Sequence, residues 1–122
     1  REEYADYLFF KRIGHRRYVE NTKKSAIVFN TPSVCGCHGW KLAEYLCMGK
    51  AIISTPLNNL MPGGFEPGTH YYVVHNESEI EEAIRLLLND KTYRSRLEKS
   101  AKKYFASDLS PKAVMMRIYN KF

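Results

Sequence analysis

The fold is decided by residues 26–55, which read AIVFNTPSVCGCHGWKLAEYLCMGKAIIST. Short continuous apolar runs lie at both ends of this segment, and such runs are typical of strands covered on both faces. Between them, a turn with two glycines precedes a stretch that predicts a helix from about Gly39 to Met48, stopped by Gly49. A strand, a helix and a second strand in this order predict parallel pairing through a right-handed crossover.

The rest of the chain extends this α/β pattern. Residues 1–25 predict two leading helical pieces divided near Gly14, and 71–74 predict a third strand within the site region 26–75. Residues 76–122 predict three C-terminal helices. We therefore expect a single partial domain over residues 1–122, with a Rossmann-like parallel sheet of about three strands flanked by helices.

The C-terminal helices carry recognisable start signals. Ser78 with Glu81 predicts a capping box, and Ser110 followed by Pro111 predicts the start of the last helix. Helical spacing predicts a buried face for that last helix. Its members are Val114, Met115, Ile118, Tyr119 and Phe122.

Composition limits the class of protein. The 122 residues carry a net charge of +6, and residues 91–122 hold nine Lys and Arg against two acids. Such a basic segment can meet nucleic acid, anionic lipid or a phosphorylated substrate, or it can be a solvated helix face. Three cysteines, an odd number, favour a reducing compartment. No apolar run is long enough for a membrane helix, and we expect the chain to begin inside a larger protein.

The residues Cys35 to His38 permit two interpretations. Cys35, Cys37 and His38 are soft metal ligands, but a structural zinc site normally needs a second ligand pair, and Cys47 is the only other cysteine. The alternative is a strand that runs into a glycine turn and a helix. We favour this second interpretation and predict no metal site.

The start of the predicted helix is the candidate ligand site. In an open parallel sheet, ligands bind beyond the carboxyl ends of the strands. There, Gly39 and Trp40 begin a helix whose first amides lack partners, which favours a phosphate group. Lys41 lies in the same first turn, where a cation is unfavourable beside the helix dipole unless an anion is bound.

Two further side chains belong to this candidate site. Glu44 follows one turn after Lys41, and a carboxylate there can accept hydrogen bonds from the two hydroxyls of a ribose. The plain alternative for Lys41 and Glu44 is a surface ion pair. His38 can donate a hydrogen bond to phosphate or sugar, or can simply bond the backbone of the turn. A catalytic residue cannot be assigned.

The order of these features resembles the C-terminal, nucleotide-sugar-binding domain of GT-B glycosyltransferases of the group 1 type. That family has a strand ending in Pro-Ser and then a motif like E-G-F-G-x-x-x-x-E-A-M-A-x-G-x-P-V-V. The matching positions here are Pro32, Ser33, Gly39, Glu44, Gly49 and the strand 50–54. The resemblance covers about residues 17–122, and Gly36 stands where the family has its first Glu.

The resemblance implies a function. It implies a fragment of an enzyme that transfers a sugar from a UDP- or GDP-type nucleotide donor to an acceptor hydroxyl, without a cofactor. Glu44 would hold the donor ribose, while Gly39, Trp40 and Lys41 would support the diphosphate, with His38 beside them. It also implies that the acceptor-binding N-terminal domain lies outside this chain, so the fragment alone should not turn over.

Two other functions stay open at this point. One is a non-catalytic nucleotide or phosphate-binding module, because Gly36 replaces an acidic residue of the family. The other is a basic nucleic-acid-binding domain, although the chain has none of the usual signatures of one. For a glycosyltransferase of surface polysaccharide synthesis we expect a cytoplasmic location, with peripheral attachment to the inner face of a membrane through the basic C-terminal helices.

Overall fold

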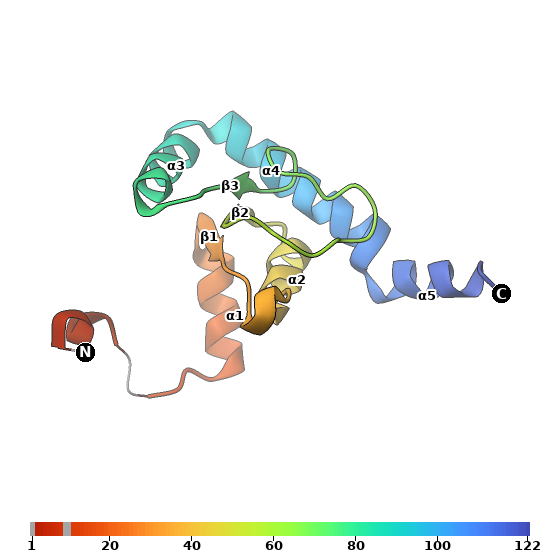
Figure 1. Cartoon of the computed structure of the whole chain (residues 1–122), viewed down its shortest axis with the longest axis horizontal. Helices are drawn as coiled ribbons and strands as arrows, with labels where there is room; N and C mark the ends of the chain where they lie inside the picture. The colour runs from red at the N-terminus through yellow and green to blue at the C-terminus, as the bar shows by residue number, and fades with distance from the viewer. Residues whose placement is uncertain (1, 9–10) are drawn as a thin grey trace.

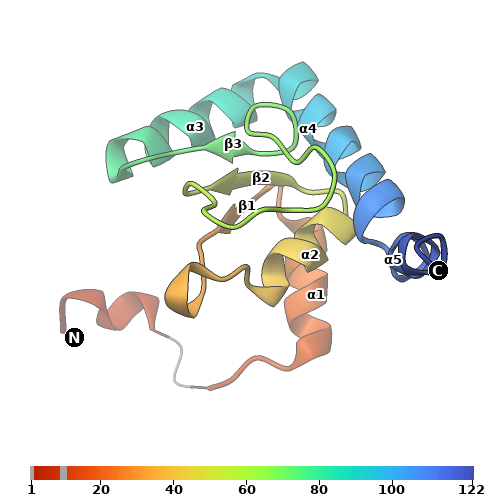
Figure 2. The same ribbon diagram turned by 45° about the vertical axis from the view of Figure 1, so that its right-hand side comes forward.

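A computed structural model describes residues 2–8 and 11–122 and contains a three-stranded parallel sheet (Figure 1). The strands are β1 (Ile27–Asn30), β2 (Ala51–Ser54) and β3 (Tyr72–Val73), in the order β1-β2-β3. Helices pack against this sheet, so the predicted α/β class is confirmed. Figure 2 shows β2 between its two neighbours.

The helices follow the order expected from the sequence. They are η1 (Glu2–Tyr7), α1 (His15–Lys24), η2 (Val34–Gly36), α2 (Trp40–Cys47), α3 (Glu77–Asn89), α4 (Lys91–Tyr104), η3 (Phe105–Leu109) and α5 (Pro111–Tyr119). The two leading pieces are thus a 3-10 turn and an α-helix, and part of the predicted first piece, residues 9 and 10, lies outside the described residues.

The core has two parts, one on each face of the sheet. Ile52 of β2 packs in a buried cluster with Leu46 of α2 and Tyr104 of α4. Ile53, the next residue, packs in a second cluster with Leu87 of α3 and Leu97 of α4. Successive side chains of a strand point to opposite faces, so β2 is buried on both sides, as its apolar sequence predicts.

The first strand is less buried than its sequence suggests. Val28 is buried, but Phe29 keeps 37% of its surface exposed and Ala26 is exposed. β1 lies at the edge of the sheet, and the residues that the structure describes do not fully cover its face at Phe29. The prediction of a strand covered on both faces is therefore right for β2 and wrong for β1.

The last helix also differs from the prediction. Its N-cap is Ser110, as predicted, whose hydroxyl accepts a hydrogen bond from the amide of Ala113 at 3.1 Å. Most of its predicted buried face is instead exposed: Tyr119 is 78% and Met115 63% accessible, and only Val114 is half-buried. Figure 1 shows α5 projecting from the rest of the molecule, which leaves this apolar face without a covering element.

The start of α3 is capped by a different pair from the one predicted. Asn76, not Ser78, is the N-cap, and its side chain accepts a hydrogen bond from the amide of Glu79 at 3.0 Å. Glu79 in turn accepts one from the amide of His75 at 2.7 Å. The helix start is therefore capped two residues earlier than predicted, and the Glu79 carboxylate reaches the residue before the N-cap rather than the N-cap itself.

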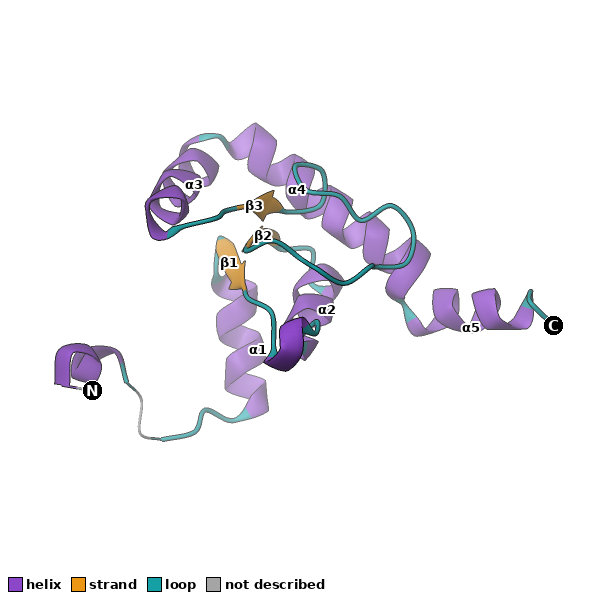
Figure 3. Ribbon diagram, viewed as in Figure 1, coloured by secondary structure: helices purple, strands orange, loops and turns teal. Residues whose placement is uncertain are grey.

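The long loop between β2 and β3 packs against α4 (Figure 3). The Phe65 ring of this loop lies 4.8 Å from the Tyr104 ring and 5.1 Å from the Tyr71 ring, measured between centroids. The Tyr104 hydroxyl donates a hydrogen bond to the Pro62 carbonyl. These contacts hold the loop against α4 and the start of β3.

Candidate functional site

The turn before α2 has a left-handed backbone. Cys35 has φ +57° and Gly36 has φ +71°, values that favour glycine. A side chain at Gly36, such as that of glutamate, would be strained in this conformation. The turn is followed by Gly39, the N-cap of α2.

The N-terminus of α2 is open. Within residues 2–8 and 11–122, no side chain caps Gly39, and Trp40 is 91% exposed. Leu42 donates its amide to the Gly39 carbonyl at 3.2 Å, but the amides of Trp40 and Lys41 precede the first helical bond. The partial positive charge of the helix start is thus presented to solvent.

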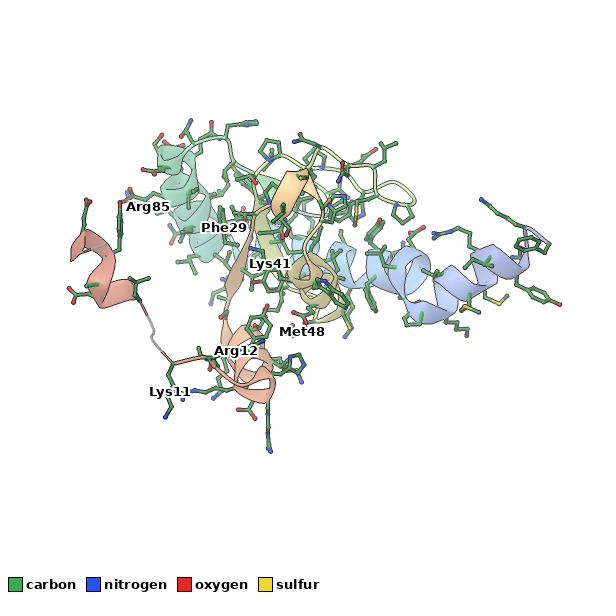
Figure 4. All side chains as sticks on the ribbon, turned by 60° about the horizontal axis from the view of Figure 1, so that its bottom comes forward. Lys11, Arg12, Phe29, Lys41, Met48 and Arg85 are labelled. Carbon is green, nitrogen blue, oxygen red and sulfur yellow. The ribbon has the colours of Figure 1, made fainter. Side chains whose placement is uncertain are left out.

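The side chain of Lys41 extends to the carboxyl end of β1. Its ammonium nitrogen donates a hydrogen bond to the Thr31 hydroxyl at 3.0 Å, and Thr31 directly follows β1. Figure 4 shows Lys41 in the central part of the molecule, whereas Lys11 and Arg12 lie in its N-terminal part. The ammonium group therefore adds a full positive charge at the carboxyl end of β1.

Three buried polar atoms belong to this same end of the sheet. They are Asn30 Oδ1, Thr55 Oγ1 and His38 Nδ1, and in the described part of the chain none has a hydrogen-bond partner. Asn30 is only 1% exposed, and its amide nitrogen donates to the Ser54 hydroxyl at 3.0 Å. Buried polar atoms are normally paired, so their gathering at the ends of β1 and β2 points to water or ligand atoms there.

His38 joins this turn to the loop after β2. Its Nε2 lies 3.1 Å from the Asn59 carbonyl oxygen, and since a carbonyl only accepts, Nε2 carries the proton. The Asn59 side chain donates to the Gly36 carbonyl at 3.1 Å. His38 thus bonds backbone, the plainer of its two predicted roles, and its Nδ1 is left as a bare acceptor.

Glu44 lies on a different side of α2 from the Lys41 ammonium group. It is half-buried and lines a pocket of about 330 Å³ between α1 and α2 with His15, Val19 and Met48. Burial raises the pKa of the Tyr18 phenol on α1, and the neighbouring Tyr45 and Glu44 side chains raise it further. Glu44 is therefore beside the Tyr18 phenol, in a pocket whose other lining side chains are mostly apolar.

The structure thus brings together only part of the predicted site. His38, Gly39, Trp40 and Lys41 follow one another around the helix start, while Glu44 faces α1. Among the ion pairs of the described residues, none joins Lys41 to Glu44, so the surface-pair alternative is wrong for them. The ligand roles of these five residues stay predictions.

Sequence reasoning missed Asn30, Thr31 and Thr55. Each is a polar residue that directly follows an apolar strand run, in "IVFNT" and "AIIST". Because parallel strands end at one edge of the sheet, this signal was available from the sequence.

The cysteines are free and exposed at positions 35, 37 and 47. In the ranges that the structure describes, no three His, Cys, Asp or Glu side chains stand close enough to bind a metal ion together. The same residues include no helix with the length and hydropathy needed to cross a membrane.

Comparison with known families bears directly on this strand–turn–helix arrangement. A family model described as "Glycosyl transferase-like" matches residues 3–120. The chain belongs to this family. The predicted resemblance to glycosyltransferases is therefore confirmed at family level, and the match includes the open α2 start, Glu44 and the helices that follow. No curated protein matches the chain.

Proposed function

We propose that this glycosyltransferase-like chain binds the nucleotide part of a sugar donor, UDP- or GDP-linked, for transfer of the sugar to an acceptor hydroxyl. The observation that supports this most directly is the uncapped start of α2 with the Lys41 ammonium group turned toward the end of β1. An amide cluster and a cation in one place suit a diphosphate group better than a neutral ligand.

The chemistry that such a site would supply is charge stabilisation. When the sugar leaves the donor, negative charge grows on the diphosphate, and fixed N–H groups with a nearby ammonium stabilise that charge. The amides of Trp40 and Lys41 and the Lys41 side chain would act in this way. The base for the acceptor hydroxyl would come from an acceptor-binding domain, the first partner that we propose for this chain.

Glu44 is proposed to hold the ribose. It lies about one helical turn from the open N-terminus, and it lines the pocket between α1 and α2. A carboxylate can accept hydrogen bonds from both ribose hydroxyls at once. The Tyr18 phenol, kept protonated by its raised pKa, is a further donor beside that ribose.

The Glu44→Ala variant tests this assignment. We expect it to bind UDP or GDP roughly 10- to 100-fold more weakly, because hydrogen bonds to a charged group are worth about 1.5–3 kcal/mol. The unaltered chain should also bind the 2′-deoxynucleotide more weakly, and the variant should lose this discrimination. Isothermal titration calorimetry measures both effects.

Glu82→Ala is the matched control, because Glu82 is an exposed carboxylate on α3. It should bind each nucleotide like the unaltered chain. If the unaltered chain binds neither UDP nor GDP, the nucleotide assignment is wrong. If it binds them without preferring ribose to deoxyribose, the chain binds nucleotides as proposed, but the assignment of Glu44 to the ribose is wrong.

A non-catalytic nucleotide-binding module is the second candidate, and Gly36 favours it. The family motif has an acidic residue at this position, and here the backbone has φ +71°. A turnover assay with a panel of sugar nucleotides, on protein that includes an acceptor-binding domain, separates the two functions. Nucleotide binding without sugar transfer would favour the module.

We also propose a cytoplasmic location with peripheral contact to an anionic membrane through α5. Its exposed apolar side chains Ile118 and Tyr119 lie in sequence between Lys112 and Lys121, and the exposed Phe122 follows them. Such a helix can lie in the interface of a charged membrane. Sedimentation with vesicles should show binding to anionic but not to zwitterionic lipid, and Tyr119→Ser should weaken it. Equal sedimentation with both lipids, or none, would contradict the contact.

A further inference from the structure

Two of the three cysteines lie in the exposed turn before α2. Cys35 and Cys37 are both free and exposed, and Gly36 is the one residue between them. A small reagent in solution can therefore reach either thiol. Neither side chain has a role in the proposed nucleotide binding, so the pair is open to a separate chemical function.

The backbone keeps these two cysteines close together. Consecutive Cα atoms are about 3.8 Å apart, so the Cα atoms of Cys35 and Cys37 are at most about 7.6 Å apart. The turn shortens this distance, because the Gly36 amide donates a hydrogen bond to the Ser33 carbonyl at 3.1 Å. The Cys37 amide likewise donates to the Val34 carbonyl at 3.2 Å. A disulfide needs Cα atoms about 4.4–6.8 Å apart, and a tight turn suits that range.

Gly36 gives the turn the freedom that a disulfide requires. Both thiols must turn to the same side of this residue, and glycine adopts left-handed and right-handed backbone conformations with similar ease. Its present φ is +71°. A Cβ built on it would come no closer than 4.0 Å to any residue beyond its chain neighbours, the nearest atom being Asn58 Nδ2. The backbone at Gly36 therefore has room to change its conformation.

Cys35 has an unusual backbone conformation of its own. With φ +57°, it is the one residue other than glycine in the left-handed region among those that the structure places. This region is disfavoured for a residue with a Cβ, and such outliers gather at functional sites. A rearrangement of the turn would release Cys35 from it, which lowers the cost of that rearrangement.

The third cysteine has no such neighbour. Cys47 is exposed too, but it is the last residue of the eight-residue helix α2. A rise of about 1.5 Å per residue puts it about 10 Å from the helix start. It is therefore at the opposite end of α2 from the turn, too far away to pair with Cys35 or Cys37. Cys47 serves as an internal control for an isolated exposed thiol.

We propose that Cys35 and Cys37 form a reversible redox pair whose oxidant is a small disulfide such as glutathione disulfide. One cysteine thiolate attacks glutathione disulfide, forms a mixed disulfide and releases one glutathione thiol. The other cysteine attacks the mixed disulfide, closes the bond between Cys35 and Cys37 and releases the second glutathione thiol. In total the two cysteines lose two electrons and two protons, which glutathione disulfide gains.

The new bond would alter the turn that leads to the helix start. The Gly36 carbonyl accepts a hydrogen bond from the Asn59 side chain at 3.1 Å, and the Cys37 carbonyl accepts one from the Ser33 amide at 2.8 Å. Both carbonyls lie beside the bond that closes, so we expect these hydrogen bonds to change and Gly39 to move. Oxidation should therefore weaken nucleotide binding, and this consequence, unlike the disulfide itself, rests on the proposed function.

Mass spectrometry after incubation with glutathione disulfide tests the redox pair. In the unaltered chain, Cys35 and Cys37 should together lose two hydrogen atoms, and any glutathione that stays attached should be on Cys47. In Cys35→Ser, the remaining Cys37 has no partner and should keep glutathione. Dithiothreitol should restore the thiols. Glutathione that stays on Cys35 or Cys37 of the unaltered chain, or two thiols that do not react, would overturn the proposal.

The fluorescence of Trp40 tests whether the turn changes. Trp40 is the sole tryptophan of the chain, is exposed and follows Cys37 closely in sequence. Oxidation should change its fluorescence, dithiothreitol should reverse the change, and Cys37→Ser should not show it. Cys47→Ser is the matched control and should respond like the unaltered chain. Unchanged fluorescence in a chain that carries the internal disulfide would contradict the expected change of the turn.

Nucleotide affinity separates this proposal from the proposed function. We expect the oxidised chain to bind UDP or GDP roughly 3- to 10-fold more weakly than the reduced chain, the effect of about one net hydrogen bond. If the disulfide forms and the reduced chain binds neither nucleotide, the redox pair is supported and the nucleotide function is wrong. If the reduced chain binds them and no disulfide forms, only the redox proposal is wrong. Equal affinity in both forms would exclude an effect of the disulfide on the site.

Discussion

Replacing Lys41 by alanine should weaken the binding of UDP or GDP roughly 10- to 100-fold, the range expected for charge-assisted hydrogen bonds of about 1.5–3 kcal/mol. The ammonium group lies 3.0 Å from Thr31 at the end of β1, next to the open helix start where the diphosphate is proposed to sit. Removing it takes away a full positive charge at the carboxyl end of β1. Calorimetric titration gives the affinity.

The same substitution should leave the fold intact. It removes one hydrogen bond to Thr31, but it also relieves the unfavourable placement of a cation at a helix N-terminus. These two effects oppose each other, so we expect the free energy of unfolding to change by less than about 1 kcal/mol.

Two controls complete this prediction. Lys41→Arg keeps the charge and should retain part of the affinity. Lys99→Ala removes an exposed charge from α4 and should have little effect. Undiminished nucleotide affinity in the alanine variant would exclude Lys41 from the site.

Leu46→Ala should lower the free energy of unfolding by about 2–5 kcal/mol, the range for large-to-small changes in a packed core. Leu46 is fully buried and joins α2 to the sheet through the cluster that contains Val28 and Ile52. A domain of this size is usually stable by about 5–15 kcal/mol, so the change removes a large part of its stability. Urea denaturation followed by circular dichroism measures it.

Tyr119→Ser is the comparison for this variant. It removes a larger side chain, but one that is 78% exposed on α5, so its effect should stay within about 0.5 kcal/mol. Comparable losses in the two variants would mean that α5 is packed against the body of the molecule in solution.

The positions of the strands and helices could be predicted from the sequence because the signals were local. The run "AIIS" is apolar throughout, and its strand is buried on both faces. The glycine after α2 has φ +64°, the backbone conformation expected of a helix stop. Ser110 begins α5 as its position before a proline predicts.

The burial of particular faces could not be predicted in the same way. Helical spacing identifies an apolar face, as on α5, but it does not say whether another element covers that face. The apolar run of β1 likewise does not say that β1 takes the edge of the sheet. Both depend on contacts between distant segments, which no local pattern contains.

The candidate site was predictable only to the level of the backbone. Gly36 and Gly39 correctly marked the turn and the helix start. The directions of the Lys41 and Glu44 side chains were not predictable from local spacing. Lys41 donates a hydrogen bond to Thr31, and Glu44 lies beside Tyr18 of α1. Their spacing suggested that the two side chains share one face of α2, but they lie on different sides of it.

The passage of α4 from one layer of the core to the other has a consequence for how the chain unfolds. Leu97 packs in the cluster that contains Leu87 of α3. Ala101 and Tyr104, one to two turns later, pack in the cluster that contains Leu46 of α2. Since α4 packs in both core clusters, we expect the two clusters to lose their native packing together. Loss of structure should be all-or-none, and the loop and helix start that α4 supports would disappear in the same step.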